Sequence, residues 1–169
     1  MASGESLIRQ LLYGREFFRN EFGVESDTYW LPDCFGFSWA LPQIIRRSGM
    51  KYFVSAKLSG QDTNPFPVST FKWKGADGSE VLAHIVKGHG YGGECDAEDI
   101  ISYDIKNAQA DVLPATIGMY GYGDGGGGCT YSMVERAERF SSVPGMPKVK
   151  QAPVSEFFKK ACKNCKVAK

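Results

Sequence analysis

One stretch of the sequence, YWLPDCFGFSWALPQIIRRSG at residues 29–49, indicates what kind of fold to expect. An apolar, aromatic run ends in a single acid, Asp33, and a predicted helix with Pro42 in its first turn follows. A carboxylate is therefore expected where a buried strand opens into a loop, and α/β enzymes hold their chemistry at such positions. An aspartate after a strand is also a common turn former or helix cap, so both interpretations of Asp33 stay open here.

The sequence around this stretch alternates helices with short apolar strands. This order predicts parallel strands joined by helices, which is an α/β fold. Two alternating runs flank the turn at Asp77-Gly78, so we predict a β-hairpin insertion there. The predicted helices cover 5–22, ending at Gly23, then 38–48, with Ser38 as its cap, 96–110, capped by Asp96, 130–140 and 155–165. The predicted strands cover 28–31, 51–56, 70–74, 80–86, 114–120 and 148–152.

The composition limits the partners of this chain. Its 169 residues fit one globular domain or a piece of a larger one. A net charge of +1 indicates neither nucleic acid nor an anionic membrane surface as a partner. Five scattered cysteines favour a reducing compartment, so we expect a cytoplasmic protein. No apolar run approaches the roughly 20 residues of a membrane span.

The segment 121–128, GYGDGGGG, allows more than one interpretation. It contains G-x-G-x-x-G between a predicted strand and a predicted helix, which is typical of a dinucleotide-binding loop. Any run so rich in glycine satisfies that pattern, and no acid follows at the required distance. Glycine also lets the backbone approach a ligand closely, so Tyr122 and Asp124 can contact a ligand at a strand end. A flexible loop without a task is the third interpretation.

Carboxylates are the best-supported catalytic candidates. His84 lies in an apolar strand and is expected in the core, whereas His89 lies in a loop as a ligand or a solvated polar group. Cys162 and Cys165 have the spacing of half a zinc site, without a second pair to complete it. Two carboxylates on either side of a bond are what glycoside hydrolysis requires. The acidic candidates are Asp33, Asp96, Asp99 and Asp124, and the aromatic residues Trp30, Phe35, Phe37 and Trp39 around the first of them suit a carbohydrate ring.

Four motifs in order resemble the catalytic domain of α-mannosidases of glycoside hydrolase family 38, closest to its cytosolic and bacterial branch. They lie at residues 3–14, 30–38, 40–44 and 121–128, and the resemblance runs from Ser3 to about Phe140. It implies a zinc-dependent retaining hydrolase that removes terminal α-linked mannose from oligosaccharides. It also implies a seven-stranded β/α barrel, of which this chain would form a part.

The resemblance also assigns roles to particular residues. Asp33 matches the family's nucleophile, which is also a zinc ligand. Phe35 matches a substrate-stacking aromatic residue, and Lys57 matches a basic position beside the nucleophile. The acid/base is not carried over from the family; Asp124 is our choice because its motif follows a strand, with Asp96 in reserve. Tyr122, beside Asp124, is expected to contact the substrate.

The sequence also departs from the family pattern. The family takes its other zinc ligands from a His-x-Asp motif and a histidine that match no part of this chain, and the histidine of a Pro-His-x-Thr-Phe pattern is replaced at Val68. We therefore expect a fragment of a longer enzyme. The alternative is a truncated, non-catalytic relative that acts as a binding or structural protein. Residues 1–142 are expected to belong to the catalytic domain, and 143–169 to form an extension. An isolated half barrel leaves strand edges unpaired, so an oligomer or a missing remainder is the expected partner.

Overall fold

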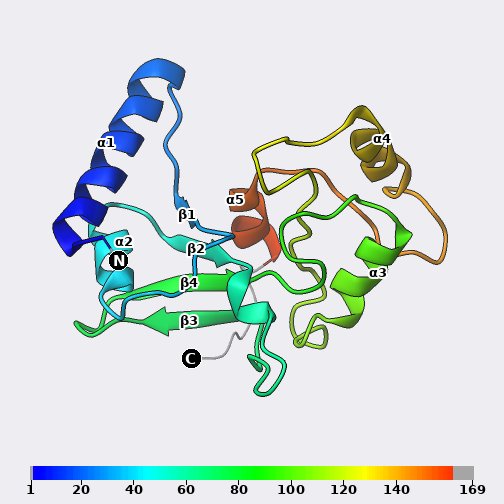
Figure 1. The fold of residues 1–169 in the computed structure, drawn as a ribbon, viewed down its shortest axis with the longest axis horizontal. Helices are drawn as coiled ribbons and strands as arrows, with labels where there is room; N and C mark the ends of the chain where they lie inside the picture. The colour runs from blue at the N-terminus through cyan, green and yellow to red at the C-terminus, as the bar shows by residue number, and fades with distance from the viewer. Residues whose placement is uncertain (1, 162–169) are drawn as a thin grey trace.

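A four-stranded sheet organises the part of the chain that the computed structural model describes, residues 2–161 (Figure 1). Its strands are β1 (Thr28–Trp30), β2 (Tyr52–Ser55), β3 (Thr70–Lys74) and β4 (Glu80–Ile85). The order across the sheet is β1-β2-β4-β3, with β2 parallel to both β1 and β4. The hairpin partner β3 pairs antiparallel with β4 at the edge. The predicted α/β class and the predicted hairpin insertion are therefore confirmed.

The central strands are apolar because they are covered on both faces. Phe53 and Val54 in β2 are almost fully buried, as are Ala83 and Ile85 in β4. Such continuous burial is expected of parallel strands with cover on each side. The edge strand β3 instead alternates buried or half-buried and exposed residues, so one of its faces is open to solvent.

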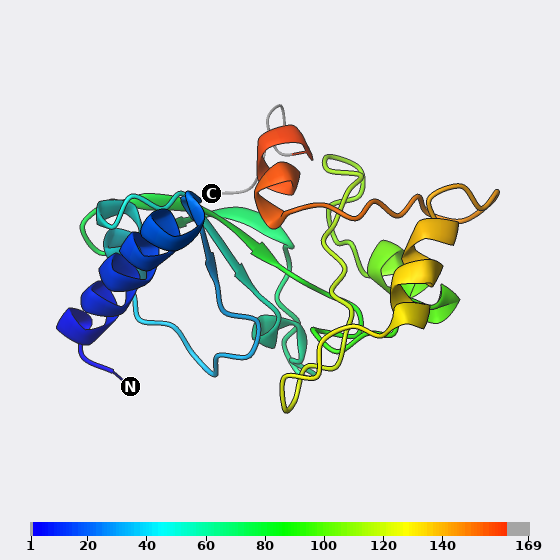
Figure 2. The ribbon, with the colours of Figure 1, turned by 90° about the horizontal axis from the view of Figure 1, so that it is seen from above.

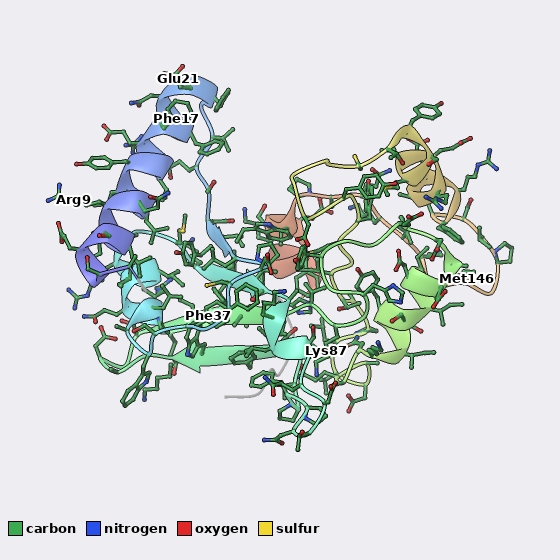
Figure 3. All side chains as sticks on the ribbon, in the orientation of Figure 1. Arg9, Phe17, Glu21, Phe37, Lys87 and Met146 are labelled. Atoms are coloured by element: carbon green, nitrogen blue, oxygen red, sulfur yellow. The ribbon has the colours of Figure 1, made fainter. Side chains whose placement is uncertain are left out.

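One face of the sheet is covered by α1 (Gly4–Phe22) and α2 (Leu41–Arg47), and Phe53 packs in the core formed there with Leu11 and Ile45. The first helix is capped as the sequence predicts, because Gly23 ends it in the left-handed conformation with φ 65°. Only one of its residues, Leu11, is buried. The aromatic side chains near its C-terminal end are exposed; Figure 3 labels Phe17 among them.

The opposite face is covered by side chains from later segments, among them Tyr103, Leu113, Met119 and Phe158. The rest of the chain contains the short helix η1 (Lys57–Ser59), α3 (Ala97–Ile105), α4 (Tyr131–Arg139), α5 (Val154–Glu156) and the π-helical turn η2 (Phe157–Ala161). The ring of Phe158 stacks on Tyr52 of β2, with the ring centroids 4.4 Å apart. Figures 1 and 2 show α1 and α2 at one end of the molecule and α3 and α4 at the other.

Several predicted boundaries are wrong. Residues 114–120 form no regular strand, because Pro114 has no amide hydrogen and Ile117 donates its amide hydrogen to Nε2 of His84; Tyr120 alone forms a bridge, with Gly93. Residues 148–152 are likewise irregular. The helix predicted over 96–110 ends at Ile105. That over 155–165 is an α turn followed by a π turn, and its residues 162–165 lie outside the described part.

The cap predicted for α2 is also wrong. Ala40 occupies the N-cap without a side-chain bond, while the Ser38 hydroxyl accepts the amide hydrogen of Ala40 at 3.2 Å. Ser38 therefore stabilises the turn that leads into the helix. The sheet of residues 2–161 has four strands and is open, so the seven-stranded barrel stays a prediction. The division of the chain at residue 142 also stays a prediction. None of the helices in the described part is both long and apolar enough to cross a bilayer.

Candidate functional site

Asp33, the predicted nucleophile, lies beyond the carboxyl end of β1, beside Lys57, which lies beyond the carboxyl end of β2. The two strands are parallel neighbours, so Asp33 and Lys57 leave the sheet at the same edge. Oδ1 of Asp33 is 2.6 Å from Nζ of Lys57. The same ammonium group lies 4.7 Å from the ring centroid of Phe35 and 5.1 Å from that of Tyr91, which is cation–π range. The side chains of Asp33, Lys57, Phe35 and Tyr91 thus meet at one point.

This ion pair fixes the charges of both partners. The hydrogen bond from Lys57 lowers the pKa of Asp33, and a weaker contribution from Tyr91 acts in the same direction. The same hydrogen bond raises the pKa of Lys57. Asp33 is 43% exposed, so its carboxylate remains accessible to a ligand although it is paired. The site therefore presents an ionised, accessible carboxylate at neutral pH.

Tyr91 connects this ion pair with the glycine-rich segment. Its hydroxyl donates to Oδ1 of Asp124 at 3.0 Å, across 33 positions of sequence. The hydrogen bond to Asp124 is the main cause that raises the pKa of Tyr91, and an interaction with Asp33 adds to it. One phenol thus interacts with both predicted catalytic carboxylates. The sequence pointed to Asp33 and Asp124, but it did not indicate that Tyr91 joins them.

The glycine-rich segment is a folded loop. Tyr122 and Gly128 exchange backbone hydrogen bonds, and Gly121 adopts φ 117°. A Cβ on Gly123 would lie 2.5 Å from the Tyr91 ring, so only glycine allows this close approach. The amides of Tyr122, Gly126 and Gly128 donate to carbonyls of the same loop, and the Thr130 side chain caps α4. Neither arrangement leaves the free helix N-terminus that a dinucleotide phosphate requires, so the positioning of Asp124 is the favoured interpretation.

An open cleft of about 610 Å³ lies between these loops. It is lined by η1, by the loop after β4 and by the tip of the glycine-rich loop, which lie along one side of the molecule in Figure 2. Tyr122 lines this cleft with its side chain half exposed. Polar and aromatic groups gathered in an open cleft are suited to a hydrophilic ring. The lining residues that carry chemistry are Lys57, His89, Tyr91, Tyr122 and Asp124.

The aromatic residues around Asp33 do not act as one cluster. Phe35 is 86% exposed beside Lys57, where a ligand can stack on it. Phe37, labelled in Figure 3, points into the core, with its ring centroid 5.0 Å from that of Phe53. Trp30 and Trp39 are exposed at the surface. The predicted place beside the acid is therefore wrong for Phe37, and the stacking of a sugar on Phe35 stays a prediction.

The remaining polar candidates fall into separate roles. Asp96 caps α3, as predicted, by accepting the amide hydrogen of Asp99 at 2.9 Å. His84 is fully buried, as predicted, and burial lowers its pKa to about 3. His89 lines the cleft, and its Nδ1 lies 2.8 Å from the carboxylate of Asp99. His89 and Tyr91 both lie in the glycine-rich run GHGYGG at residues 88–93, shortly after β4. That run is the sequence feature that could have pointed to both residues.

The donor set does not by itself make a metal site. Among residues 2–161, no three His, Cys, Asp or Glu side chains come close enough to hold one ion. Asp33, the predicted ligand, forms an ion pair with Lys57, and its role as a zinc ligand stays a prediction. A zinc site needs at least three protein ligands, so the described residues can supply only part of one.

Fold and site together define an α/β protein with a polar cleft at the carboxyl ends of its parallel strands. The chain belongs to glycosyl hydrolases family 38: residues 1–167 match the model of the family's N-terminal domain. Alpha-mannosidase G of Dictyostelium discoideum is 43% identical over 94% of this chain and 15% of the relative. Alpha-mannosidase 2C1 of Mus musculus is 40% identical with the same coverage of both chains.

Structural comparison agrees with this membership at the level of the fold. A crystal structure of an alpha-mannosidase from Enterococcus faecalis V583 matches 98% of this chain and 20% of that protein, with a TM-score of 0.64 and 15% identity. The chain therefore spans about 15% of the length of the curated relatives named above.

Proposed function

We propose that this chain forms part of the catalytic domain of a retaining α-mannosidase, which removes terminal α-linked mannose from oligosaccharides with Asp33 as the nucleophile. One observation carries the proposal: the Asp33 carboxylate lies at a strand end, is held ionised by Lys57, and shares Tyr91 with a second carboxylate, Asp124. Family membership and the names of the relatives support the choice of mannosides. The three unpaired thiols within residues 2–161 fit the cytoplasmic location that this proposal includes.

The two carboxylates suit the two steps of a retaining mechanism. In the first step, Asp33 attacks the anomeric carbon while Asp124, protonated, gives its proton to the leaving oxygen. The bond from carbon to the leaving oxygen breaks as the ester to Asp33 forms. In the second step, a water molecule gives a proton to Asp124 and attacks the same carbon, which releases mannose and restores both side chains.

The neighbouring groups support these roles in different ways. Lys57 favours the ionised form of the nucleophile, as its effect on the pKa of Asp33 indicates. The Tyr91 hydroxyl orients Asp124 through its hydrogen bond. Phe35 offers an exposed ring for stacking on the sugar, and Tyr122 forms a wall of the cleft.

The proposal includes a zinc ion in the complete catalytic domain. Asp33 would be one ligand, and the others would come from outside the described residues. A bound divalent cation keeps a carboxylate ionised and can hold sugar hydroxyls. Elemental analysis of the purified complete protein tests this part: about one zinc per chain is expected, and Asp33→Asn is expected to lower that content.

The test of the nucleophile compares Asp33→Asn with Asp62→Asn in the complete protein. Asp62 is exposed in the loop 60–67, so its replacement controls for the loss of a surface charge. Asp33→Asn is expected to lower kcat for an aryl α-mannoside on the order of 10³-fold or more, with Asp62→Asn unchanged. A fluorinated mannoside that slows the second step should label the peptide containing Asp33. Full activity of Asp33→Asn would remove the proposed role.

A second candidate is a non-catalytic member that binds mannosides. The observation that favours it is the incomplete metal donor set within residues 2–161, together with the salt bridge that occupies Asp33. It predicts saturable binding of a mannoside by the complete protein without hydrolysis and without zinc. Titration calorimetry beside a hydrolysis assay separates the two candidates, because only the first one yields free mannose.

A further inference from the structure

A buried carboxylate holds a histidine at the wall of the cleft. Asp99 is only 3% exposed, and its Oδ1 lies 2.8 Å from Nδ1 of His89. Its Oδ2 accepts the amide hydrogens of Glu94 at 2.5 Å and of Cys95 at 2.8 Å. The carboxylate is therefore satisfied by three donors, one of which is the imidazole. A charge buried at this depth is stable only with such partners.

The loop that carries the histidine is built closely around this contact. Gly88 and Gly90, on either side of His89, have φ values of 95° and 76°, which favour glycine. A Cβ on Gly88 would lie 2.5 Å from the Tyr103 ring, and one on Gly93 would lie 2.9 Å from Oδ2 of Asp99. The backbone thus passes against a rigid ring and against the carboxylate itself. These contacts hold the backbone before and after His89, and Asp99 holds its side chain.

Cys95 adds a further sign that the loop is shaped for this carboxylate. It has φ 56°, and among the residues 2–161 no other residue besides glycine has a positive φ. Backbone in this region is unfavourable for such a residue and persists where surrounding contacts require it. Here the conformation accompanies the hydrogen bond from the Cys95 amide to Asp99. The loop adopts an unfavourable conformation and keeps the carboxylate satisfied.

One ring nitrogen of His89 is left for a ligand. A carboxylate only accepts hydrogen bonds, so Nδ1 carries the proton of the contact with Asp99. Within the described residues, Nε2 makes no hydrogen bond, and the histidine lines the same cleft as Tyr91 and Asp124. The other histidine, His84, has both ring nitrogens bonded and is buried. The two histidines therefore have different roles.

We propose that His89 binds one hydroxyl group of the sugar through Nε2 and that Asp99 is its positioning residue. The proposal rests on the proposed function, because it takes the cleft as a mannoside site. A hydroxyl can both donate and accept, so it pairs with an imidazole nitrogen in either protonation state. A histidine already fixed by Asp99 loses little side-chain freedom when the sugar binds, which favours affinity. His89 thereby helps to select among hexoses that differ in one hydroxyl.

The experiment combines protein variants with sugars that lack single hydroxyls. The complete protein is titrated with methyl α-D-mannoside and with its monodeoxy analogues, and the corresponding aryl mannosides are assayed for kcat and KM. Each ligand is tested on wild type, His89→Ala, Asp99→Asn and Glu98→Ala. Glu98 is exposed in the first turn of the same helix as Asp99, so its replacement is the matched control.

One deoxy analogue is expected to bind wild type about 5–10-fold more weakly, which is the loss of one hydrogen bond. His89→Ala should weaken binding of the parent sugar by a similar factor. Its affinity should not change further when that same hydroxyl is removed from the sugar. KM should rise with kcat nearly unchanged, because the bond is present in both ground and transition states. Asp99→Asn should raise KM in the same way, and Glu98→Ala should match wild type throughout.

The outcomes separate this inference from the function on which it rests. If wild type hydrolyses the mannoside and His89→Ala remains as sensitive as wild type to every missing hydroxyl, the histidine proposal is overturned and the enzymatic proposal stands. If binding couples His89 to one hydroxyl without any hydrolysis, the histidine proposal stands and the enzymatic one fails. If wild type neither binds nor hydrolyses mannosides, both are overturned.

Discussion

Acid should destabilise this protein through His84, the histidine in the middle of the sheet. Its ring contacts Thr70 of β3 through Nδ1, at 2.8 Å, and receives the Ile117 amide hydrogen on Nε2, at 3.4 Å. It therefore connects the edge strand with the segment that leads to the glycine-rich loop. Full burial lowers the pKa of His84 from 6.5 to about 3, so the native state holds this ring neutral.

The direction and size of the effect follow from proton linkage. The unfolded chain takes up a proton near pH 6.5, whereas the folded chain does so only near pH 3, so unfolding becomes easier as the pH falls between these values. The two pKa values differ by roughly 3.5, which corresponds to at most about 5 kcal/mol. Between about pH 7.5 and about pH 5, the expected loss in the free energy of unfolding is about 2 kcal/mol from His84 alone.

Urea unfolding followed by tryptophan fluorescence, at both pH values, measures this loss. His84→Gln cannot titrate, so it should lose about 2 kcal/mol less than wild type on acidification, whatever its stability at neutral pH. Equal losses in wild type and His84→Gln would refute the reasoning.

Two further predictions concern the site. Lys57→Met removes the hydrogen bond that lowers the pKa of Asp33, so the acid limb of the pH profile of kcat/KM should move to higher pH. Lys57→Arg should move this limb less. An acid limb at the same pH in Lys57→Met and wild type would contradict the role of the ion pair. Gly88→Ala places a Cβ at φ 95° and 2.5 Å from the Tyr103 ring, whereas Gly90→Ala meets only the unfavourable φ of 76°. Thermal unfolding should therefore show Gly88→Ala to be the less stable variant, with backbone strain alone worth about 1–3 kcal/mol in each, and equal melting temperatures would argue against the packing of the ring on Gly88.

The sheet could be predicted because its signals are local. The apolar run before Asp33 and the alternating strands around Asp77-Gly78 each specify their own element, and the structure forms both. The strand predicted over residues 114–120 is wrong because the apolar residues of this segment pack against the sheet as irregular chain. Met119 is buried in the core there, and the Tyr103 hydroxyl donates to its carbonyl at 2.9 Å. Burial alone does not separate such a segment from a strand.

The site was predictable only in part, because two of its contacts join distant loops. Asp33 and Lys57 follow adjacent parallel strands, so their meeting follows from the fold once the strand order is known. Tyr91 and Asp124 are 33 positions apart and come from irregular loops, whose register no periodicity indicates. Phe35 and Phe37 show the same limit: they are two positions apart, yet the first faces solvent and the second packs in the core.

Asp99 is a different case, because its position in the sequence indicates that it is buried. It lies in the first turn of α3, where an acid is expected on the surface to interact with the helix dipole. Four positions later, Tyr103 lies on the same helix face, and both are buried. An acid in phase with the apolar face of a helix is a candidate for a buried, paired carboxylate. That periodicity distinguishes Asp99 from Glu98, which is exposed.

Two of the glycines that line the cleft allow tyrosine rings to pack against the backbone. Gly88 lies against the ring of Tyr103, and Gly123 lies against the ring of Tyr91, each so closely that a Cβ would meet the ring at 2.5 Å. Each tyrosine then uses its hydroxyl to fix a second segment: Tyr103 bonds the carbonyl of Met119, and Tyr91 bonds Asp124. Glycine therefore gives these loops a defined conformation, because it admits a rigid ring where any other residue would hold the two chains apart. A loop built in this way can hold a carboxylate at a constant place beside Asp33, which a freely moving glycine-rich loop could not do.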